Sequence, residues 1–167
     1  MQDELTKVDI EKMQEELEYR QNVLMPQIME EVKRARAFGD LSENFEYKAA
    51  KQEQGRNTSR IRYLQNMIKS AVVISADSAE DVVGLFDKVV LFFEDDEEEQ
   101  EIRFVTTLRQ NPLEGLISKE SPLGKAVIGH KVGERVIVQV NESYSYGVVI
   151  RSIEKGADDA SLEINSY

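Results

Sequence analysis

The sequence predicts an α+β protein in which an antiparallel hairpin of two long helices precedes a β-rich domain. Apolar residues in roughly the first 75 positions recur at steps of three, four or seven, which is the spacing of amphipathic helices. A short turn within residues 35–47 separates two such patterns, so the two helices are expected to run antiparallel. After Ile74 the pattern changes to alternating or short apolar runs, which are typical of strands.

The first helix is expected to run from about Thr6 to Phe38. Pro26 lies inside it, where it removes one backbone donor and clashes with the preceding turn, so a kink is expected near Asn22. The predicted apolar seam contains Ile10, Met13, Leu17, Leu24, Ile28, Val32 and Ala35.

The second helix is expected to supply the matching seam. Its middle, from Gln52 to Arg60, is polar, so this helix should pack more weakly there. The expected seam residues are Phe45, Ala49, Ile61, Leu64, Ile68 and Ala71.

The β-rich domain is expected to contain four strands and one short helix. Residues 88–93 and 101–107 read as strands joined by an acidic loop at 94–99, and residues 134–140 and 146–153 read as a second pair. Residues 121–129 predict a short helix with Pro122 at its first position and Gly129 at its end. The predicted organisation is a hairpin at 1–75, a linker at 76–80, a β-rich domain at 81–155 and a tail without clear pattern at 156–167.

Composition predicts a folded chain with a cytoplasmic location. The hydrophobic fraction of 41% is enough for a modest core, and the absence of cysteine excludes disulfides and thiolate metal sites. The first residues lack the apolar stretch of a signal peptide, and no run reaches the roughly 18 apolar residues of a membrane span, so no membrane partner is expected.

The net charge of −11 argues against a general nucleic-acid binder, but the charge is distributed unevenly. Residues 1–75 carry −1 and residues 76–167 carry −10. Between residues 33 and 62 cations exceed anions, so the distal half of the hairpin is locally basic while its turn is acidic.

The turn holds two carboxylates, Asp40 and Glu43, for which two interpretations remain open. Asp40 could be the N-cap of the second helix and Glu43 its third residue, as a variant of the capping box. Alternatively, the pair could bind Mg²⁺, which favours hard oxygen ligands. Two carboxylates alone make a weak site, so such an ion would need further ligands from a partner.

Two motifs then make the sequence recognisable. The segment Gly39-Asp40-Leu41-Ser42-Glu43-Asn44, followed by Glu46-Tyr47 and Ala49-Ala50, closely resembles the bacterial Gre-type transcript cleavage factors, and the GreA type most of all. These are transcription elongation factors that bind RNA polymerase. A second match lies about 75 residues later, in Ile117-Ser118, in Ser121-Pro122-Leu123-Gly124-Lys125-Ala126, and in Ile128-Gly129 and Lys131-Val132-Gly133. The resemblance covers roughly residues 5–153.

The resemblance implies an antiparallel coiled coil followed by an FKBP-like domain. The FKBP-like domain would dock on RNA polymerase, and the coiled coil would enter the secondary channel, where the 3′ end of backtracked nascent RNA lies. The protein would not be an enzyme itself but would stimulate the polymerase's own cleavage of that RNA. A monomer is expected, because the two helices of the hairpin would cover each other's apolar faces.

The resemblance also implies roles for individual residues. Asp40 and Glu43 match the acidic pair that helps to hold Mg²⁺ jointly with the polymerase, and no Mg²⁺ is expected in the free protein. Arg36 and Lys51 match basic positions that face RNA, although each could be an ordinary solvated helix residue. Tyr47 could pack across the hairpin or stack on a base. The residues expected to shape the tip are Gly39, Leu41, Ser42, Asn44 and Tyr47.

Two alternative functions are weighed against cleavage stimulation. The protein could occupy the polymerase channel and exclude other factors without stimulating cleavage, although retention of both tip carboxylates counts against this. It could also be a peptidyl-prolyl isomerase, an activity suggested only by the implied FKBP-like fold. The acidic loop and the segment 141–147 depart from the family pattern, which leaves the docking contacts open.

Overall fold

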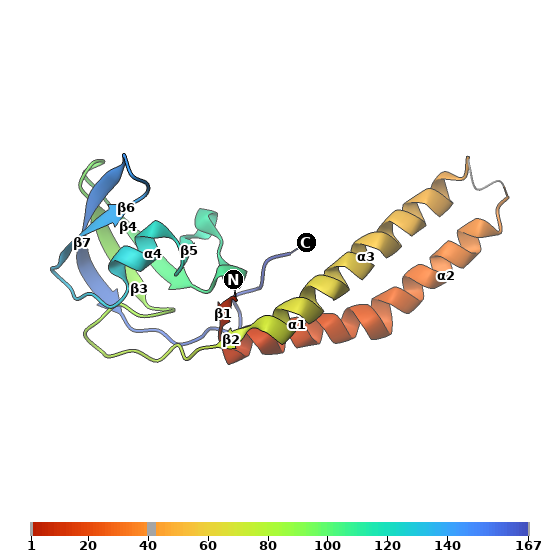
Figure 1. Ribbon diagram of the computed structural model, residues 1–167, viewed down its shortest axis with the longest axis horizontal. Coiled ribbons are helices and arrows are strands. Elements are labelled where there is room, and N and C mark those ends of the chain that lie inside the picture. The colour runs from red at the N-terminus through yellow and green to blue at the C-terminus, as the bar shows by residue number, and fades with distance from the viewer. Residues whose placement is uncertain (1, 40–42, 167) are drawn as a thin grey trace. The chain divides into compact units, whose positions relative to one another are not determined.

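A computed structural model describes residues 2–39 and 43–166 of the protein (Figure 1). The described residues fall into two compact units. The first unit holds mainly residues 10–71, and the second holds residues 3–9 together with 72–166. The start of the predicted hairpin segment, residues 3–9, therefore groups with the β-rich part of the chain.

The first unit is an antiparallel helical hairpin (Figure 1). Its first arm consists of α1 (Lys7–Tyr19), a π-helical segment η1 (Arg20–Leu24) and α2 (Met25–Arg36), and its second arm is α3 (Phe45–Ser70). At a rise of 1.5 Å per residue, α3 is about 39 Å long. Hydrogen bonds from Arg60 to Glu16 and from Asn44 to Ala35 show that the arms run in opposite directions.

The predicted seam is confirmed for most of the first arm, where only Ile10 and Leu24 are half-buried, and in part for the second. Met13, Leu17, Ile28, Val32 and Ala35 are buried as expected, and so is Leu64 of α3. Phe45, however, is 80% exposed, and Ala49 is exposed as well. The less exposed face of α3 runs from Leu64 through residues 57, 50 and 47, which recur at helical spacing. Phe45 and Ala49 lie outside this face, so the prediction was wrong for them.

The chain forms a π-helical turn at the place where the sequence predicts a kink. The backbone N–H of Met25 bonds to the carbonyl of Arg20, five residues earlier, instead of four. Pro26, which follows immediately, has no N–H to donate to the carbonyl of Asn22. The wider turn therefore lies next to the residue that interrupts the regular α-helical pattern.

The second unit contains a mixed sheet and one short α-helix, which confirms the α+β class (Figure 1). The described strands of this five-stranded sheet lie in the order β5-β4-β3-β7-β6, and within the sheet only the β4–β5 pair is parallel. The bounds are β3 (Lys88–Phe93), β4 (Glu98–Val105), β5 (Leu116–Ser118), β6 (Arg135–Gln139), β7 (Ser145–Glu154) and α4 (Pro122–Val127).

The core of this unit forms between one face of the sheet and α4. Leu123 and Val127 of α4 pack in the same cluster as the inward side chains of the strands. The strand residues of this cluster include Val89, Leu91, Ile102, Phe104, Val136, Val138, Val148 and Ile150. In β3 and β6 these residues alternate with less buried ones, which is the pattern of strands that are buried on one face.

Several element bounds differ from the sequence prediction. The acidic loop is shorter than expected, because Glu98 and Glu99 pair with Phe93 and Phe92 and belong to β4. The sequence also did not predict β5, the 3₁₀ turns η2 (Thr107–Arg109) and η3 (Pro112–Glu114), or the parallel pair of β1 (Glu4–Leu5) and β2 (Val72–Val73). These elements are two or three residues long and carry too little pattern to be recognised.

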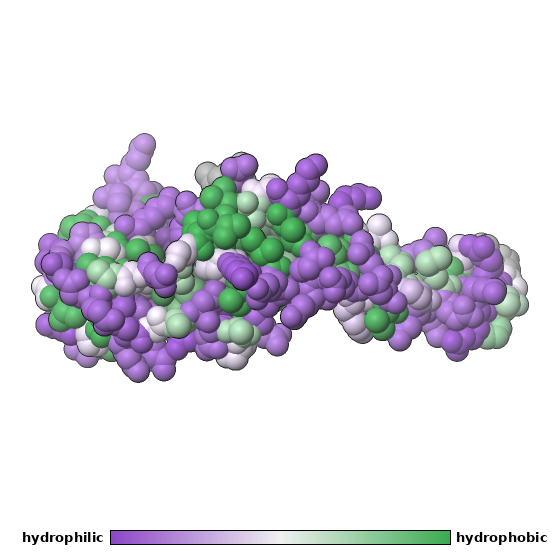
Figure 2. All heavy atoms as spheres, turned by 90° about the horizontal axis from the view of Figure 1, so that it is seen from below, coloured by the Kyte–Doolittle hydropathy of each residue, from purple (hydrophilic) through white to green (hydrophobic). Residues whose placement is uncertain are grey.

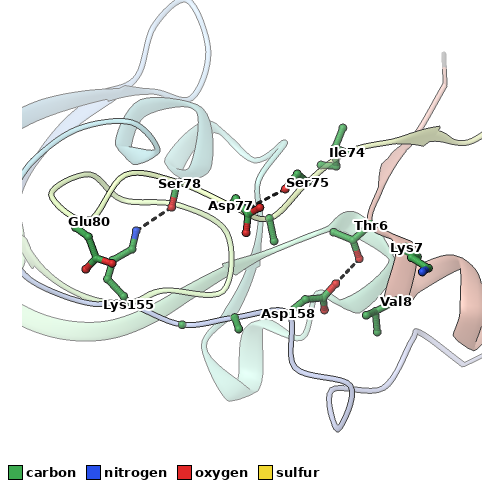
Figure 3. A pocket seen from close by; sticks show the side chains of 13 residues that line it. Thr6, Lys7, Val8, Ile74, Ser75, Asp77, Ser78, Glu80, Lys155 and Asp158 are labelled. Atoms are coloured by element: carbon green, nitrogen blue, oxygen red, sulfur yellow. Dashed lines mark hydrogen bonds between the residues drawn. The ribbon is translucent and has the colours of Figure 1, made fainter.

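A buried polar network in the second unit holds the beginning of α1. Arg109 of η2 is fully buried, and its Nε donates to the carboxylate of Asp9 at 2.6 Å. Its guanidinium carbon lies 4.7 Å from the ring centre of Phe86. Thr6 donates to Asp158, which also pairs with Arg109, and Figure 3 shows this contact beside the neighbouring pocket. Residues of the predicted tail, 156–167, thus contribute to the interior of this unit.

No helix among the described residues is sufficiently long and apolar to span a bilayer.

Candidate functional site at the hairpin tip

The turn between α2 and α3 carries the residues that the sequence singles out. Asp40, Leu41 and Ser42 lie outside the described residues. Glu43 is described, and it is exposed in the turn that precedes α3. Gly39 has φ of +115°, a backbone conformation that glycine adopts more readily than residues with a Cβ.

Asn44 is the residue that starts α3. Its side-chain oxygen accepts the backbone N–H of Tyr47 at 3.0 Å, which is the bond of an N-cap. Its side-chain nitrogen donates to the carbonyl of Ala35 at 2.6 Å, across the hairpin. Asn44 therefore joins the end of one arm to the beginning of the other.

The capping interpretation of Asp40 and Glu43 is wrong. The helix begins at Phe45, so Glu43 precedes the N-cap instead of being the third helical residue. Asn44 supplies the acceptor that the interpretation assigned to Asp40. The carboxylate of Glu43 is consequently not used to cap α3.

Cations surround the tip on both arms. The last turn of α2 carries Lys33, Arg34 and Arg36, a position where positive charge is favoured by the helix dipole. Arg36 is exposed, and its guanidinium lies 5.7 Å from the ring centre of Tyr47. Lys51 is exposed and donates to the side chain of Gln54 at 2.9 Å. Both predicted RNA-facing residues therefore have accessible charges, along with local contacts that would also suit a purely structural role.

Aromatic side chains flank the turn. Tyr47 is half-buried under Arg36. Phe38 and Phe45 are 67% and 80% exposed, and both line an open hollow that also includes Glu43, Asn44 and Glu46. Figure 2 shows mostly hydrophilic side chains at this end of the hairpin, with isolated apolar ones among them. The exposure of Phe38 and Phe45 was missed in the sequence, where Phe45 was assigned to the seam.

The described tip residues include carboxylates of the kind that bind a divalent metal ion. Glu43 and Glu46 bring hard carboxylate oxygens to the hollow, the kind of ligand that Mg²⁺ favours. Within the described ranges, no group of three or more His, Cys, Asp or Glu side chains is placed to hold a metal. An ion held by Glu43 would need ligands from Asp40 or from another molecule.

The second sequence motif builds the link between β5 and α4. The hydroxyl of Ser121 accepts the N–H of Gly124 at 3.0 Å and donates to the carbonyl of Ser118 at 2.7 Å. A Cβ on Gly124 would lie 2.6 Å from the carbonyl oxygens of Ser118 and Lys119, so the close approach requires glycine. These residues thus have a structural explanation that does not require ligand contact.

Together, the helical hairpin with a turn that exposes a carboxylate and the mixed-sheet unit define an α+β protein with its candidate site at a hairpin tip. A family model described as "Transcription elongation factor, N-terminal" matches residues 4–73, and one described as "Transcription elongation factor, GreA/GreB, C-term" matches residues 77–155. The chain belongs to the GreA/GreB family of transcription elongation factors.

Individual relatives agree with this assignment. The chain is 45% identical over 136 residues to transcription elongation factor GreA of Geobacillus kaustophilus, covering 81% of this chain and 86% of that protein. It is 44% identical over 130 residues to GreA of Bacillus subtilis, covering 77% and 82%. Gfh1 of Thermus thermophilus is similar in structure, with 26% identity, coverage of 93% and 100%, and a TM-score of 0.44. The family assignment depends on the sequence matches, because a TM-score below 0.5 carries little weight.

Proposed function

We propose that this protein binds RNA polymerase and stimulates the polymerase's own cleavage of backtracked RNA, so that arrested complexes restart. In this proposal the second unit docks on the polymerase, and the hairpin enters the secondary channel until its tip reaches the 3′ end of the RNA. The factor has no cleavage activity of its own, because its tip supplies only part of the metal site. Membership of the GreA/GreB family supports this function.

The observation that carries the proposal is the position of Glu43. Its side chain is exposed immediately before the N-cap, and Asn44 rather than Glu43 satisfies the start of the helix. A carboxylate in a turn that does not need it for capping is available for another ligand.

In the proposed mechanism, Asp40 and Glu43 would hold a Mg²⁺ ion together with carboxylates of the polymerase. When bound, such an ion stabilises the charge on the attacking and leaving oxygens of phosphodiester hydrolysis. Arg36 and Lys51 offset the charge of RNA phosphates. The free protein acts as a monomer.

A transcript-shortening assay on defined backtracked complexes tests this function. The Asp40→Asn/Glu43→Gln double variant should bind the polymerase like the unchanged protein but lose cleavage stimulation by about 100-fold, because metal charge stabilisation is worth several kcal/mol. Glu15→Gln/Glu18→Gln, which removes two exposed carboxylates with the same spacing from α1, is the matched control and should retain full stimulation.

Full stimulation by the tip variant would overturn the proposed role of the carboxylates. Polymerase binding by the unchanged protein with no effect on cleavage would instead favour a channel-occupying regulator. Isomerase activity has little support, because the pocket beside α4 is lined by aliphatic and polar side chains, two lysines among them, rather than by aromatic ones. Its side chains include Ile74, Val82, Val83, Leu85, Ile128, Lys119 and Lys125.

A further inference from the structure

The middle of the hairpin is held by polar side chains at positions where a helical seam is normally apolar. Asn57 and Arg60 of α3 are only 2% and 3% exposed. Together with Leu64, they are the buried residues of this 26-residue helix. Apolar packing in this part of α3 is therefore sparse, and polar contacts must supply much of the pairing between the arms.

These contacts form a connected network across the two arms. Arg60 donates twice to the carboxylate of Glu16, at 2.7 and 3.0 Å. Arg20 donates to the same carboxylate at 2.8 Å and to the side-chain oxygen of Asn57 at 2.8 Å. Asn57 returns a bond from its side-chain nitrogen to the backbone carbonyl of Arg20 at 3.2 Å.

The network coincides with the irregular turn of the first arm. Arg20 is the first residue of η1, and its carbonyl accepts from both the N–H of Met25 and the side chain of Asn57. A π-helical turn changes the rotational phase of the residues that follow it. The Asn57 side chain thus bonds to the backbone of the π-helical turn itself, which fixes the position of α3 along the first arm.

We propose that Glu16, Arg20, Asn57 and Arg60 fix the axial register of the hairpin and thereby position the two sides of its tip relative to each other. Apolar contact is non-directional and tolerates displacement along the helix, whereas buried polar groups must be paired in a defined geometry. Buried asparagine and ionic groups have this role in coiled coils, where they specify register. A slip of one helical turn, about 5.4 Å, would separate both cross-arm pairs, Arg60 from Glu16 and Asn57 from Arg20.

The consequence for the tip depends on the proposed function. A constellation that binds a catalytic ion must be held to within about 0.5 Å of its productive geometry. A slip of one turn displaces the start of α3 by about ten times that distance relative to the end of α2. The four residues are therefore positioning residues, which act on cleavage through the placement of Asp40 and Glu43.

Spin-label distances in the free protein test the register directly. Because the natural sequence has no cysteine, cysteines can be introduced at Lys33 and Arg62, which are exposed on opposite arms and staggered along the hairpin. We expect one narrow distance distribution in the otherwise unchanged protein. A Glu16→Leu/Asn57→Leu/Arg60→Leu variant replaces three members of the polar network by apolar side chains and should show a broadened distribution or a second population shifted by about 5 Å.

Two further variants control for folding and for polarity. Asn57→Leu alone removes the contact with η1 and should also broaden the distribution, so it decides the question if circular dichroism shows that the triple variant is unfolded. Gln54→Leu removes a half-buried amide that contacts Lys51 on the same helix, and it should leave the narrow distribution unchanged. A narrow, unshifted distance in a helical Asn57→Leu protein would overturn the inference.

The cleavage assay separates the register from its proposed consequence. Stimulation by the triple variant should fall by about 100-fold while polymerase binding is retained, since a displacement of 1 Å can already have an effect of that size. An altered distance together with full stimulation would preserve the register assignment but refute its link to the tip. Because the distance is measured without polymerase, failure of the proposed function does not affect that result.

Discussion

The side-chain oxygen of Asn44 accepts the backbone N–H of Tyr47 at 3.0 Å, so α3 begins at Phe45 and Glu43 stands outside the helix. The same asparagine donates to the carbonyl of Ala35 on the opposite arm. One residue therefore both ends the turn and ties its two sides together. This arrangement separates the structural task of capping from the chemical task proposed for Glu43.

Asn44→Ala should destabilise the hairpin by about 1 kcal/mol, because the N-cap acceptor and the contact with Ala35 are both lost. Urea unfolding followed by circular dichroism measures this change. Asn44→Ser is the informative control, since serine keeps a capping oxygen but cannot reproduce the amide contact, and it should have a smaller effect. An alanine variant as stable as the unchanged protein would contradict the assigned cap.

Stability of the hairpin should fall at acidic pH because of Glu16. Burial raises the pKa of Glu16, but the hydrogen bonds and charges of Arg60 and Arg20 together lower it below the ordinary value of 4.5. A carboxyl group with a lowered pKa stabilises the folded state above its unfolded pKa, and this stabilisation is lost as pH falls through the folded value. It should thus be complete at pH 7 and decline below about pH 4.5.

The comparison that isolates Glu16 is thermal unfolding of the unchanged protein and of Glu16→Gln over the same pH range. Glu16→Gln should be less stable at neutral pH, and the difference between the two proteins should shrink as the solution becomes acidic. A difference that stays constant with pH would show that Glu16 does not contribute through its charge.

Arg109→Met should destabilise the second unit by about 3–5 kcal/mol, because it leaves the fully buried carboxylate of Asp9 without its ionic partner. Chemical unfolding measures the loss. Lys131→Met is the matched control, because its pair with Asp81 is exposed on both sides and should contribute little. Adding Asp9→Leu to Arg109→Met should recover part of the stability, and no recovery would argue against an unpaired charge as the cause.

Two glycine substitutions should have opposite effects. Gly124→Ala would place a Cβ 2.6 Å from two backbone oxygens and should destabilise the second unit by about 1–3 kcal/mol. Gly55→Ala, inside α3 with no atom within 4 Å of the added Cβ apart from its chain neighbours and the adjacent helix backbone, should stabilise the hairpin by about 1 kcal/mol. Melting temperatures of the two variants measure both effects, and a stabilising Gly124→Ala would show that the β5–α4 link can relax.

Much of the architecture follows from local pattern. The seam of the first arm, the strands around Val89 and Val148, and the capped helix after Ser121 were all predictable, because each has a period or a capping residue that recurs within a few positions. The acidic turn was also visible as the break between two helical patterns. Its role as a cap was misjudged, because Asp40 and Asn44 are both suitable capping residues and spacing alone does not choose between them.

The sequence by itself determined the α+β class, the hairpin and the place of Glu43 in its turn, since these depend on periodicity and on neighbouring residues. Only the tertiary structure decided that Arg109 meets Asp9 in the interior, and that Asn57 and Arg60 fill the seam opposite Arg20 and Glu16. Each of these pairs joins residues 37 to 100 positions apart. A charged or polar side chain in a sequence normally indicates an exposed position, and only a partner brought close by the fold makes its burial favourable.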